Sequence, residues 1–252
     1  MKLDCVLTAV NENPQYLDFI PFFIQAWNKL YPLVDIKIIL IGNSIPRRFL
    51  QYQSNIILFQ PIPGVLTSFT SQFIRLLYPC ILNYENGVLI TDIDMIPMNR
   101  TYYTKNIEPY DNRKFIYFGA NDILNEITIC YNVATPNTWK QVFKIQSTAD
   151  IANLLKLIAA HNEIVEGHGN KGWSIDQNFL TQEINKWNAK TNNFVALKTF
   201  NTGYNRLDRG FNTTTSNLDI EVDIKNEKYT DYHCYRPMLK YYELNYKILN
   251  LL

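Results

Sequence analysis

The 252-residue chain contains only four cysteines, and no two of them form a Cys-x-x-Cys pair. Cys5, Cys80, Cys130 and Cys234 are far apart, so their spacing gives no zinc signature. Each of them lies in or beside an apolar segment, which favours buried free thiols over disulfides.

The sequence also lacks a long apolar run and an excess of charge. No run approaches the ~18 residues of a membrane-spanning helix, so no membrane span is expected. The first ten residues carry Asp4 in their apolar stretch and have no small-residue cleavage site, which indicates a strand rather than a signal peptide. We therefore expect a soluble, cytoplasmic protein. Its 24 basic and 23 acidic residues give a net charge of +1, which argues against a nucleic-acid partner.

Apolar residues are plentiful, at 47% of the sequence, and can form a substantial core. In the first hundred residues, strand-like and helix-like patterns alternate, which predicts a parallel, doubly wound sheet. The strands are expected at 5–10, 36–42, 55–61 and 87–94, and the helices at 15–30 and 67–82. Pro79 should bend or shorten the second helix.

The second half of the chain is less regular. It predicts strands at 114–122 and 127–135 and helices at 137–145, 148–164 and 174–187. Because no repeat or Pro/Ser-rich linker interrupts the sequence, we expect one α/β domain over 1–252. Its central sheet should be mainly parallel, but mixed, with flanking helices.

Two aspartates interrupt the apolar segment LITDIDMIPM. On a strand, Asp92 and Asp94 would share a face, with Cβ atoms ~6.6 Å apart. Two carboxylates this close together are both ionised readily only when a cation lies between them. A hard divalent ion could be that cation. A polar turn stopped by Pro97 is the alternative. A calcium loop is excluded because DIDMIPMNRTYY lacks the further acid, glycine and glutamate that it needs.

The segment SQFIRLLYPCILNYENGVLITDIDMIP resembles GT-A glycosyltransferases, in which a helix with a basic residue precedes a strand ending in Asp-x-Asp. CVLTAVNEN extends the resemblance loosely to the first strand. ITICYNVATPNTWKQVF, WSIDQNFL and DYHCYRPM look like segments of the glycogenin-like enzymes, although the Asn-Ser-Gly strand and the C-terminal His–Gly–Lys–Pro–Trp pattern of that family are absent. Soluble viral or bacterial transferases look like nearer relatives.

This resemblance implies a GT-A fold with a Rossmann-like nucleotide-binding half (1–98) and a sugar- and acceptor-binding half (99–252). It also implies that Asp92 and Asp94 hold Mn²⁺ or Mg²⁺, with Asp92 also at the nucleotide-sugar. His233 would be the third ligand, which points to manganese because imidazole suits Mn²⁺ better than Mg²⁺. A histidine without a ligand role remains the alternative.

Further residues are candidates for binding or catalysis. Arg75 would reach the sugar or diphosphate, unless it is a solvated surface charge. Asp176 resembles the acid that faces the reacting sugar or acceptor, but it could merely complement the dipole of its helix. The other candidates are Gln177 for catalysis, Thr8 and Asn11 for uracil or ribose, Asn121 and Asp122 for sugar hydroxyls, Trp173 as a platform for a sugar ring, and Arg236 for phosphate. In YNRLDRG, Arg206, Asp208 and Arg209 are phosphate candidates as well, but a self-paired surface loop is favoured.

The implied activity is metal-dependent transfer of a sugar from a nucleoside-diphosphate sugar, with UDP expected, to an acceptor hydroxyl of a glycan or glycoprotein. A nucleotidyltransferase that makes a nucleotide-sugar is an alternative. It would need a glycine-rich, basic loop after the first strand, and TAVNENPQY has neither glycine nor a basic residue. A non-catalytic nucleotide- or sugar-binding module is a second alternative. The intact Asp92, Asp94 and Asp176 argue against it, and a turnover assay distinguishes it from an enzyme.

Overall fold

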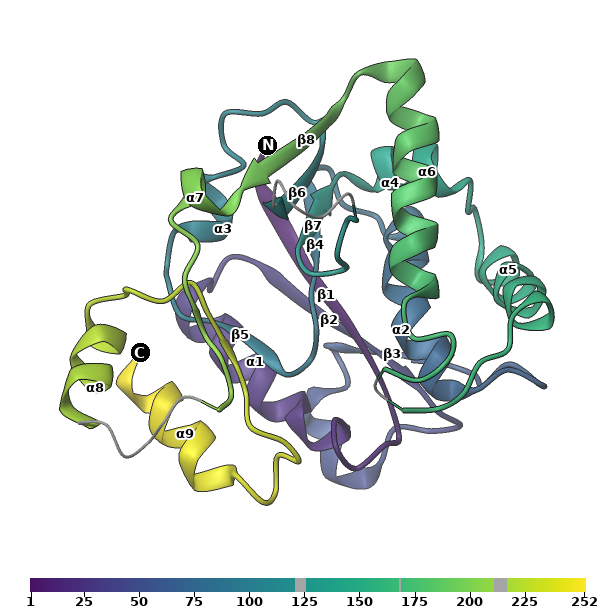
Figure 1. Cartoon of the computed structure of the whole chain (residues 1–252). Coiled ribbons are helices and arrows are strands. Elements are labelled where there is room, and N and C mark those ends of the chain that lie inside the picture. The colour runs from purple at the N-terminus through teal and green to yellow at the C-terminus, as the bar shows by residue number, and fades with distance from the viewer. Residues whose placement is uncertain (121–125, 168, 211–216) are drawn as a thin grey trace.

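A mixed seven-stranded sheet forms the centre of the molecule (Figure 1). The computed structural model describes residues 1–120, 126–167, 169–210 and 217–252. The strand order is β3-β2-β1-β4-β7-β6-β8. The strands are β1 (Leu3–Asn11), β2 (Asp35–Ile41), β3 (Ile56–Phe59), β4 (Gly87–Ile90), β6 (Phe115–Ala120), β7 (Asn132–Ala134) and β8 (Phe194–Lys198). The first four run parallel, whereas β7 is antiparallel to β4 and β6. The predicted mainly parallel, mixed sheet is confirmed.

Helices cover both faces of this sheet. The longer ones are α1 (Ile20–Leu30), α2 (Thr67–Leu77), α4 (Pro136–Phe143), α5 (Thr148–His161), α6 (Ile175–Thr191), α8 (Asn217–Lys225) and α9 (Tyr242–Leu251), and the short ones are α3 (Tyr102–Lys105) and α7 (Thr199–Thr202). Within the described ranges, three 3₁₀ turns accompany these helices, at Leu17–Phe19, Arg47–Tyr52 and Tyr78–Ile81. As predicted, Pro79 ends α2, because it lies in the 3₁₀ turn that follows Leu77.

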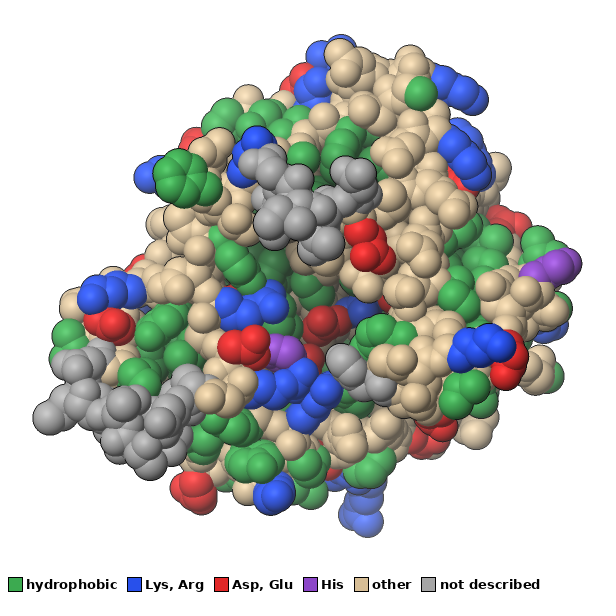
Figure 2. Space-filling view, in the orientation of Figure 1, with side chains coloured by type: hydrophobic (Ala, Val, Ile, Leu, Met, Phe, Trp, Pro, Cys, Tyr) green, Lys and Arg blue, Asp and Glu red, His purple; other side chains and the backbone are tan. Residues whose placement is uncertain are grey.

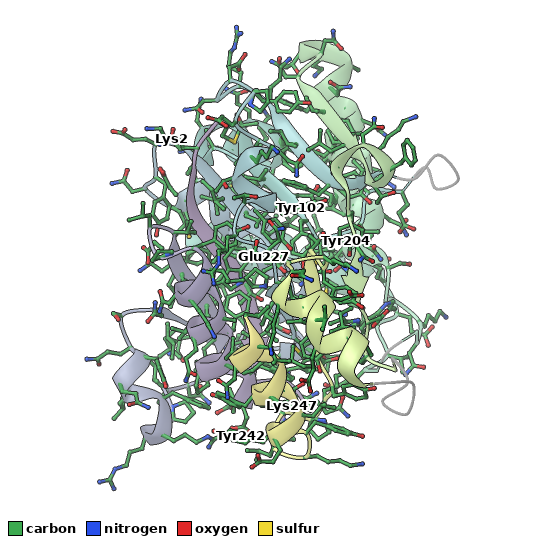
Figure 3. The ribbon with its side chains drawn as sticks, turned by 90° about the vertical axis from the view of Figure 1, so that its left-hand side faces the viewer. Lys2, Tyr102, Tyr204, Glu227, Tyr242 and Lys247 are labelled. Atoms are coloured by element: carbon green, nitrogen blue, oxygen red, sulfur yellow. The ribbon has the colours of Figure 1, made fainter. Side chains whose placement is uncertain are left out.

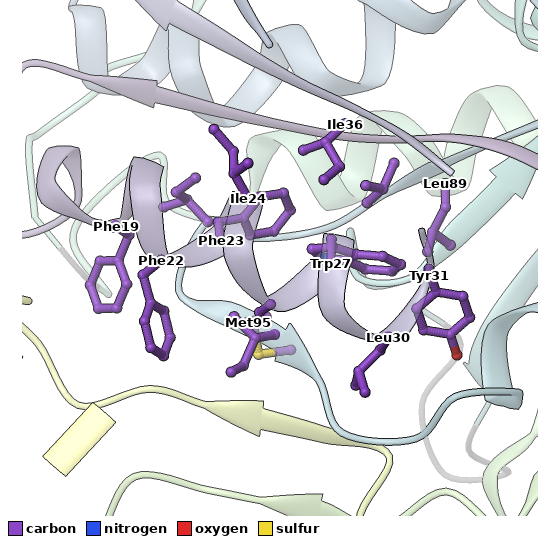
Figure 4. Close-up of a cluster of buried hydrophobic side chains, with 14 of the residues drawn as sticks. Phe19, Phe22, Phe23, Ile24, Trp27, Leu30, Tyr31, Ile36, Leu89 and Met95 are labelled. Carbon is purple, nitrogen blue, oxygen red and sulfur yellow. The ribbon is translucent and has the colours of Figure 1, made fainter. Parts of the chain in front are cut away.

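β1 is buried on both faces, as its continuous apolar run predicts. Val6 and Val10 belong to the core under α1, and Cys5 and Leu7 to the core under α2. In Figure 4, α1 lies between the strands that carry Ile36 and Leu89 and the segment that carries Met95, and its aromatic side chains belong to this core. The apolar side chains of α2 pack on the opposite face of the sheet. Both helices therefore pack against β1, which pairs with β4.

A second, three-stranded sheet lies beside the first. It consists of β5 (Met95–Pro97), β10 (Asp231–His233) and β9 (Arg206–Leu207), in the order β5-β10-β9. β10 pairs antiparallel with β5 and parallel with β9. This small sheet therefore joins the segment after β4 to residues more than a hundred positions later, which places β10 and β9 beside Asp92 and Asp94.

The C-terminal helices pack against each other and close one side of the molecule. α8 and α9 lie side by side in Figure 3, and Lys247 on α9 forms an ion pair with Glu221 on α8 at 2.8 Å. Tyr102 and Tyr204, both labelled in this view, have ring centroids 6.2 Å apart. No helix within the described ranges is both long and apolar enough to cross a membrane.

All four cysteines are free thiols, as predicted. The predicted strand 87–94 is wrong at its end, because β4 stops at Ile90 and Asp92 and Asp94 lie in the connection to β5. The two carboxylates are therefore presented by a turn, and the spacing of a strand does not apply to them.

Gly87 starts β4 at a position with no space for a side chain. A Cβ atom there would lie 2.9 Å from the carbonyl oxygen of Lys2 and 2.9 Å from Cγ2 of Val133. We expect Gly87→Ala to lower the free energy of unfolding by about 1–3 kcal/mol, because backbone has to move to relieve the overlap. Gly42→Ala is the matched control, since its nearest neighbour would be Cδ of Glu12 at 3.5 Å. Urea titrations of both variants measure the difference; equal loss in the two would contradict this prediction.

Candidate functional site

A cavity of about 740 Å³ opens at the carboxyl ends of β1 and β4. Its lining comes from the end of β1, from α2, from the turn after β4, from the start of α6, and from β9, β10 and the residues after them. Figure 2 shows a hollow in the middle of the molecule where acidic, basic and histidine side chains gather. Ligands of open α/β sheets bind at this end of the strands.

Asp94 is the most enclosed acid of this cavity. One of its oxygens, Oδ2, lies 3.1 Å from Nη1 of Arg209, 3.5 Å from Nε2 of His233 and 3.6 Å from Nη1 of Arg236. Burial by itself would raise the pKa of Asp94, but His233 and Arg209 outweigh it and lower the pKa below its ordinary value. Asp94 is therefore held as a carboxylate in a strongly cationic setting.

His233 is oriented by a second carboxylate. Its Nδ1 lies 2.8 Å from Oδ1 of Asp208. Because an ionised carboxylate only accepts hydrogen bonds, Nδ1 donates to Asp208, while Nε2 faces Oδ2 of Asp94. A carboxylate behind an imidazole is the usual support of a metal-binding histidine.

Asp92 faces Arg75 at another wall of the cavity. Nη1 of Arg75 donates to Oδ1 of Asp92 and to the carbonyl oxygen of Thr91, and its Nε donates to the carbonyl oxygen of Gln72. Arg75 is buried and fixed by these contacts, so it is not the solvated surface charge that was the alternative. The side chain of Asp92, which lines the cavity, is 38% exposed.

Asp176 lies in the first turn of α6 and lines the cavity together with Trp173 and Gln177. Its side chain is buried, and its Oδ1 accepts a hydrogen bond from the backbone N–H of Gln177. Burial raises the pKa of Asp176 to about 6, although Arg75 acts in the opposite direction. An acid with this pKa is ionised at neutral pH and protonated in mild acid.

The remaining predicted residues lie in different places. Asn11 lines the cavity and donates to Oγ1 of Thr67 at 3.1 Å, and Arg236 lines it with its guanidinium over the ring of Tyr16. Thr8 is fully buried within β1, away from the lining, and its hydroxyl has no partner among the described residues. Asn121 and Asp122 lie outside the residues that the structure describes.

The prediction of a self-paired loop at YNRLDRG is wrong. Arg206 pairs with the buried Asp231, and Arg209 with Asp94, which is 115 positions away in the sequence. Asp208 pairs with His233 rather than with its neighbours. Sequence reasoning missed these partners because β9 and β10 are only two and three residues long and give no periodic signal.

The donor types around Asp94 suit a divalent cation. Carboxylates and an imidazole are ligands of Mn²⁺, and Nε2 of His233 already faces Asp94. Asp92 turns toward Arg75, so within the described part of the chain no three acidic, histidine or cysteine side chains converge in a ligating arrangement. Two of the three predicted ligands therefore face each other, and the third lines the same cavity.

No protein-family model and no curated protein sequence matches the chain. Several solved glycosyltransferase structures do match. The galactosyltransferase LgtC, solved with donor and acceptor sugar analogues, is 11% identical at a TM-score of 0.50, over 98% of this chain and 96% of its own. The apo form of the glycosyltransferase GlyE of Streptococcus pneumoniae is 15% identical at a TM-score of 0.51, over 99% of this chain and 63% of its own. The bifunctional glycosyltransferase WbbM is 10% identical at a TM-score of 0.50, over 98% of this chain and 49% of its own.

These likenesses show the fold. The chain has the GT-A fold of these glycosyltransferases, as the sequence resemblance implied. It spans nearly all of LgtC, but less than two thirds of GlyE and about half of WbbM.

Proposed function

We propose that the chain transfers a sugar from a UDP-sugar to an acceptor hydroxyl of a glycan or a protein-linked glycan. The observation that carries this proposal is the convergence of Asp92, Asp94 and His233 with Arg75, Arg209 and Arg236 in one cavity at the carboxyl ends of the parallel strands. A cluster of fixed guanidinium groups suits a diphosphate, because each offers paired N–H donors to phosphate oxygens.

Asp92, Asp94 and His233 would hold Mn²⁺ or Mg²⁺. When bound, such an ion stabilises the negative charge that develops on the leaving diphosphate. Arg75 and Arg236 would contact the phosphates, since both line the cavity. Asn11, at the end of β1, would hydrogen-bond the nucleoside.

Asp176 and its neighbours would act at the sugar. With a pKa of about 6, Asp176 is ionised at neutral pH, so it can accept a proton from the acceptor hydroxyl in an inverting reaction. In a retaining reaction, the same carboxylate would stabilise a sugar cation or act as nucleophile. Gln177 would hydrogen-bond a sugar hydroxyl, and Trp173 would offer its ring as an apolar platform.

A screen of nucleotide-sugars for manganese-dependent hydrolysis tests the proposed function. Slow transfer to water reports the donor without knowledge of the acceptor, and we expect UDP to be released from one donor of the panel. If UDP and Mn²⁺ raise the melting temperature but no donor releases UDP, the chain is a binding module and the proposed activity is wrong.

If His233 is a metal ligand, loss of its imidazole and loss of the carboxylate that supports it should both weaken Mn²⁺ binding, the first more than the second. We expect His233→Ala to weaken Mn²⁺ binding strongly, and Asp208→Asn to weaken it by about 10- to 100-fold, because an imidazole without its supporting carboxylate is a less basic and less well oriented ligand. Titration of Mn²⁺ by calorimetry measures both. An unchanged metal titration in His233→Ala would remove it from the ligands, and an unchanged one in Asp208→Asn would show that the support is dispensable.

A further inference from the structure

Two arginine side chains lie close to one carboxylate oxygen of the candidate site, Oδ2 of Asp94. Nη1 of Arg209 and Nη1 of Arg236 lie 3.1 and 3.6 Å from Oδ2 of Asp94, on the side where Nε2 of His233 also points. Both arginines line the cavity, and they belong to different segments, one after β9 and the other after β10. The side chain of Asp94 is only 5% exposed, so water cannot replace these partners freely.

A divalent ion and these guanidinium groups compete for that oxygen. Oδ2 has two lone pairs, and an ion bound to it would lie close to two positive charges in a partly desolvated site, where repulsion is stronger than in water. We therefore expect an ion that binds Oδ2 of Asp94 together with His233 to displace Arg209 and Arg236. The displaced side chains remain in the cavity, within reach of a ligand bound there.

The ion pairs of this cluster already occupy the carboxylates. Asp92 faces Arg75, and Asp94 faces Arg209 and Arg236. A divalent ion bound alone at Asp94 would separate the two guanidinium groups from their carboxylate and add two positive charges beside them. A diphosphate bound together with the ion would offset this charge, since it brings at least two negative charges and accepts the hydrogen bonds of displaced guanidinium groups.

We propose that Arg209 and Arg236 exchange partners: they compete with the divalent ion for Asp94, and they turn to the diphosphate when ion and nucleotide are bound together. This proposal rests on the proposed function, because it takes a nucleoside diphosphate and a divalent ion as the ligands of the cavity. It makes the two arginines responsible for coupling, so that neither ligand binds tightly without the other. The coupling is reciprocal by linkage.

A four-corner binding cycle tests the exchange. Calorimetry measures the Kd of Mn²⁺ without and with UDP, and the Kd of UDP without and with Mn²⁺, in the wild-type chain and in Arg209→Gln, Arg236→Gln and the double variant. We expect Mn²⁺ alone to bind each single variant more tightly, by a factor at or above the roughly 5-fold lower end of typical coupling factors. We expect UDP affinity to fall strongly when Mn²⁺ is present and little when it is absent.

Two controls separate exchange from a general charge effect. Arg113→Gln removes an arginine from the exposed Arg113–Asp111 pair, whose residues do not line the cavity, and should leave all four constants unchanged. Melting curves verify that each variant is folded, and the single variants keep one guanidinium on Asp94 if the double variant does not fold. A long-range charge effect would lower UDP affinity equally with and without Mn²⁺.

The outcomes are distinct. The exchange is overturned if Arg209→Gln and Arg236→Gln bind Mn²⁺ alone no more tightly than the wild-type chain, or if they lose UDP affinity equally in both conditions. Either result leaves the proposed function intact, provided that the wild-type chain binds UDP and Mn²⁺ together. A wild-type chain that binds Mn²⁺ in neither condition contradicts the metal role itself.

Discussion

Asp94→Asn is expected to abolish the metal-stimulated turnover of the nucleotide-sugar, with a loss of about 10³-fold or more in kcat/KM. Asp94 is the acid that His233 faces, and the amide would take away the charge that attracts a divalent ion. A metal ion contributes several kcal/mol to the stabilisation of a leaving diphosphate, and each 1.36 kcal/mol is a factor of ten in rate. We expect the same direction for Asp92→Asn.

The assay compares Mn²⁺-stimulated UDP release in these variants with that in Asp111→Asn, which disrupts an exposed Asp–Arg pair outside the cavity. The control should keep full activity, and all three variants should keep cooperative melting curves. If Asp92→Asn and Asp94→Asn remain fully active in an excess of chelator, the metal role of the two aspartates is wrong.

Asp176→Asn is expected to lower kcat by about 10²- to 10⁴-fold, the usual contribution of a positioned proton acceptor, and at the same time to stabilise the fold at neutral pH. The pKa of Asp176 is raised to about 6, above its ordinary value of 3.8. A raised carboxyl pKa favours the folded state below pH 3.8 and loses that contribution as the pH rises through 6. At pH 8, the buried, ionised Asp176 then costs about 3 kcal/mol, which the neutral amide avoids.

Thermal melts at pH 4 and pH 8 measure this difference. The melting temperature of Asp176→Asn should exceed that of the wild-type chain at pH 8, and the two should converge at pH 4. The activity of the wild-type chain should fall as the pH drops below 6, because the carboxylate then becomes protonated. An Asp176→Asn variant that loses both activity and stability at pH 8 would assign Asp176 a structural role.

The main sheet and its helices could be predicted from the sequence because their segments are long and strongly periodic. The continuous apolar run of β1 and the stripe of α2, ended at Pro79, gave their positions to within a few residues. The structure of the segment after β4 was harder to predict. Asp92 and Asp94 lie in a turn, but their apolar neighbours in the sequence are typical of a strand.

The candidate site was only partly predictable. The order of a parallel sheet places Asn11 and the two aspartates at one edge, and the structure brings Arg75, Asp176, His233 and Arg236 to the same cavity. The contacts of Arg206, Asp208 and Arg209 could not be predicted, because they depend on the pairing of two very short strands, β9 and β10. Thr8 shows that a position near a strand end can still be buried, away from the cavity.

A crystal structure of the chain with UDP and Mn²⁺, with anomalous data collected for manganese, tests the central claim most directly. The account predicts one anomalous peak within about 2.0–2.6 Å of carboxylate oxygens of Asp94, the usual range for divalent ions on oxygen ligands, with His233 at the same ion and the diphosphate beside it. A diphosphate bound in the cavity with no manganese at Asp94, or a peak at other residues, would contradict it.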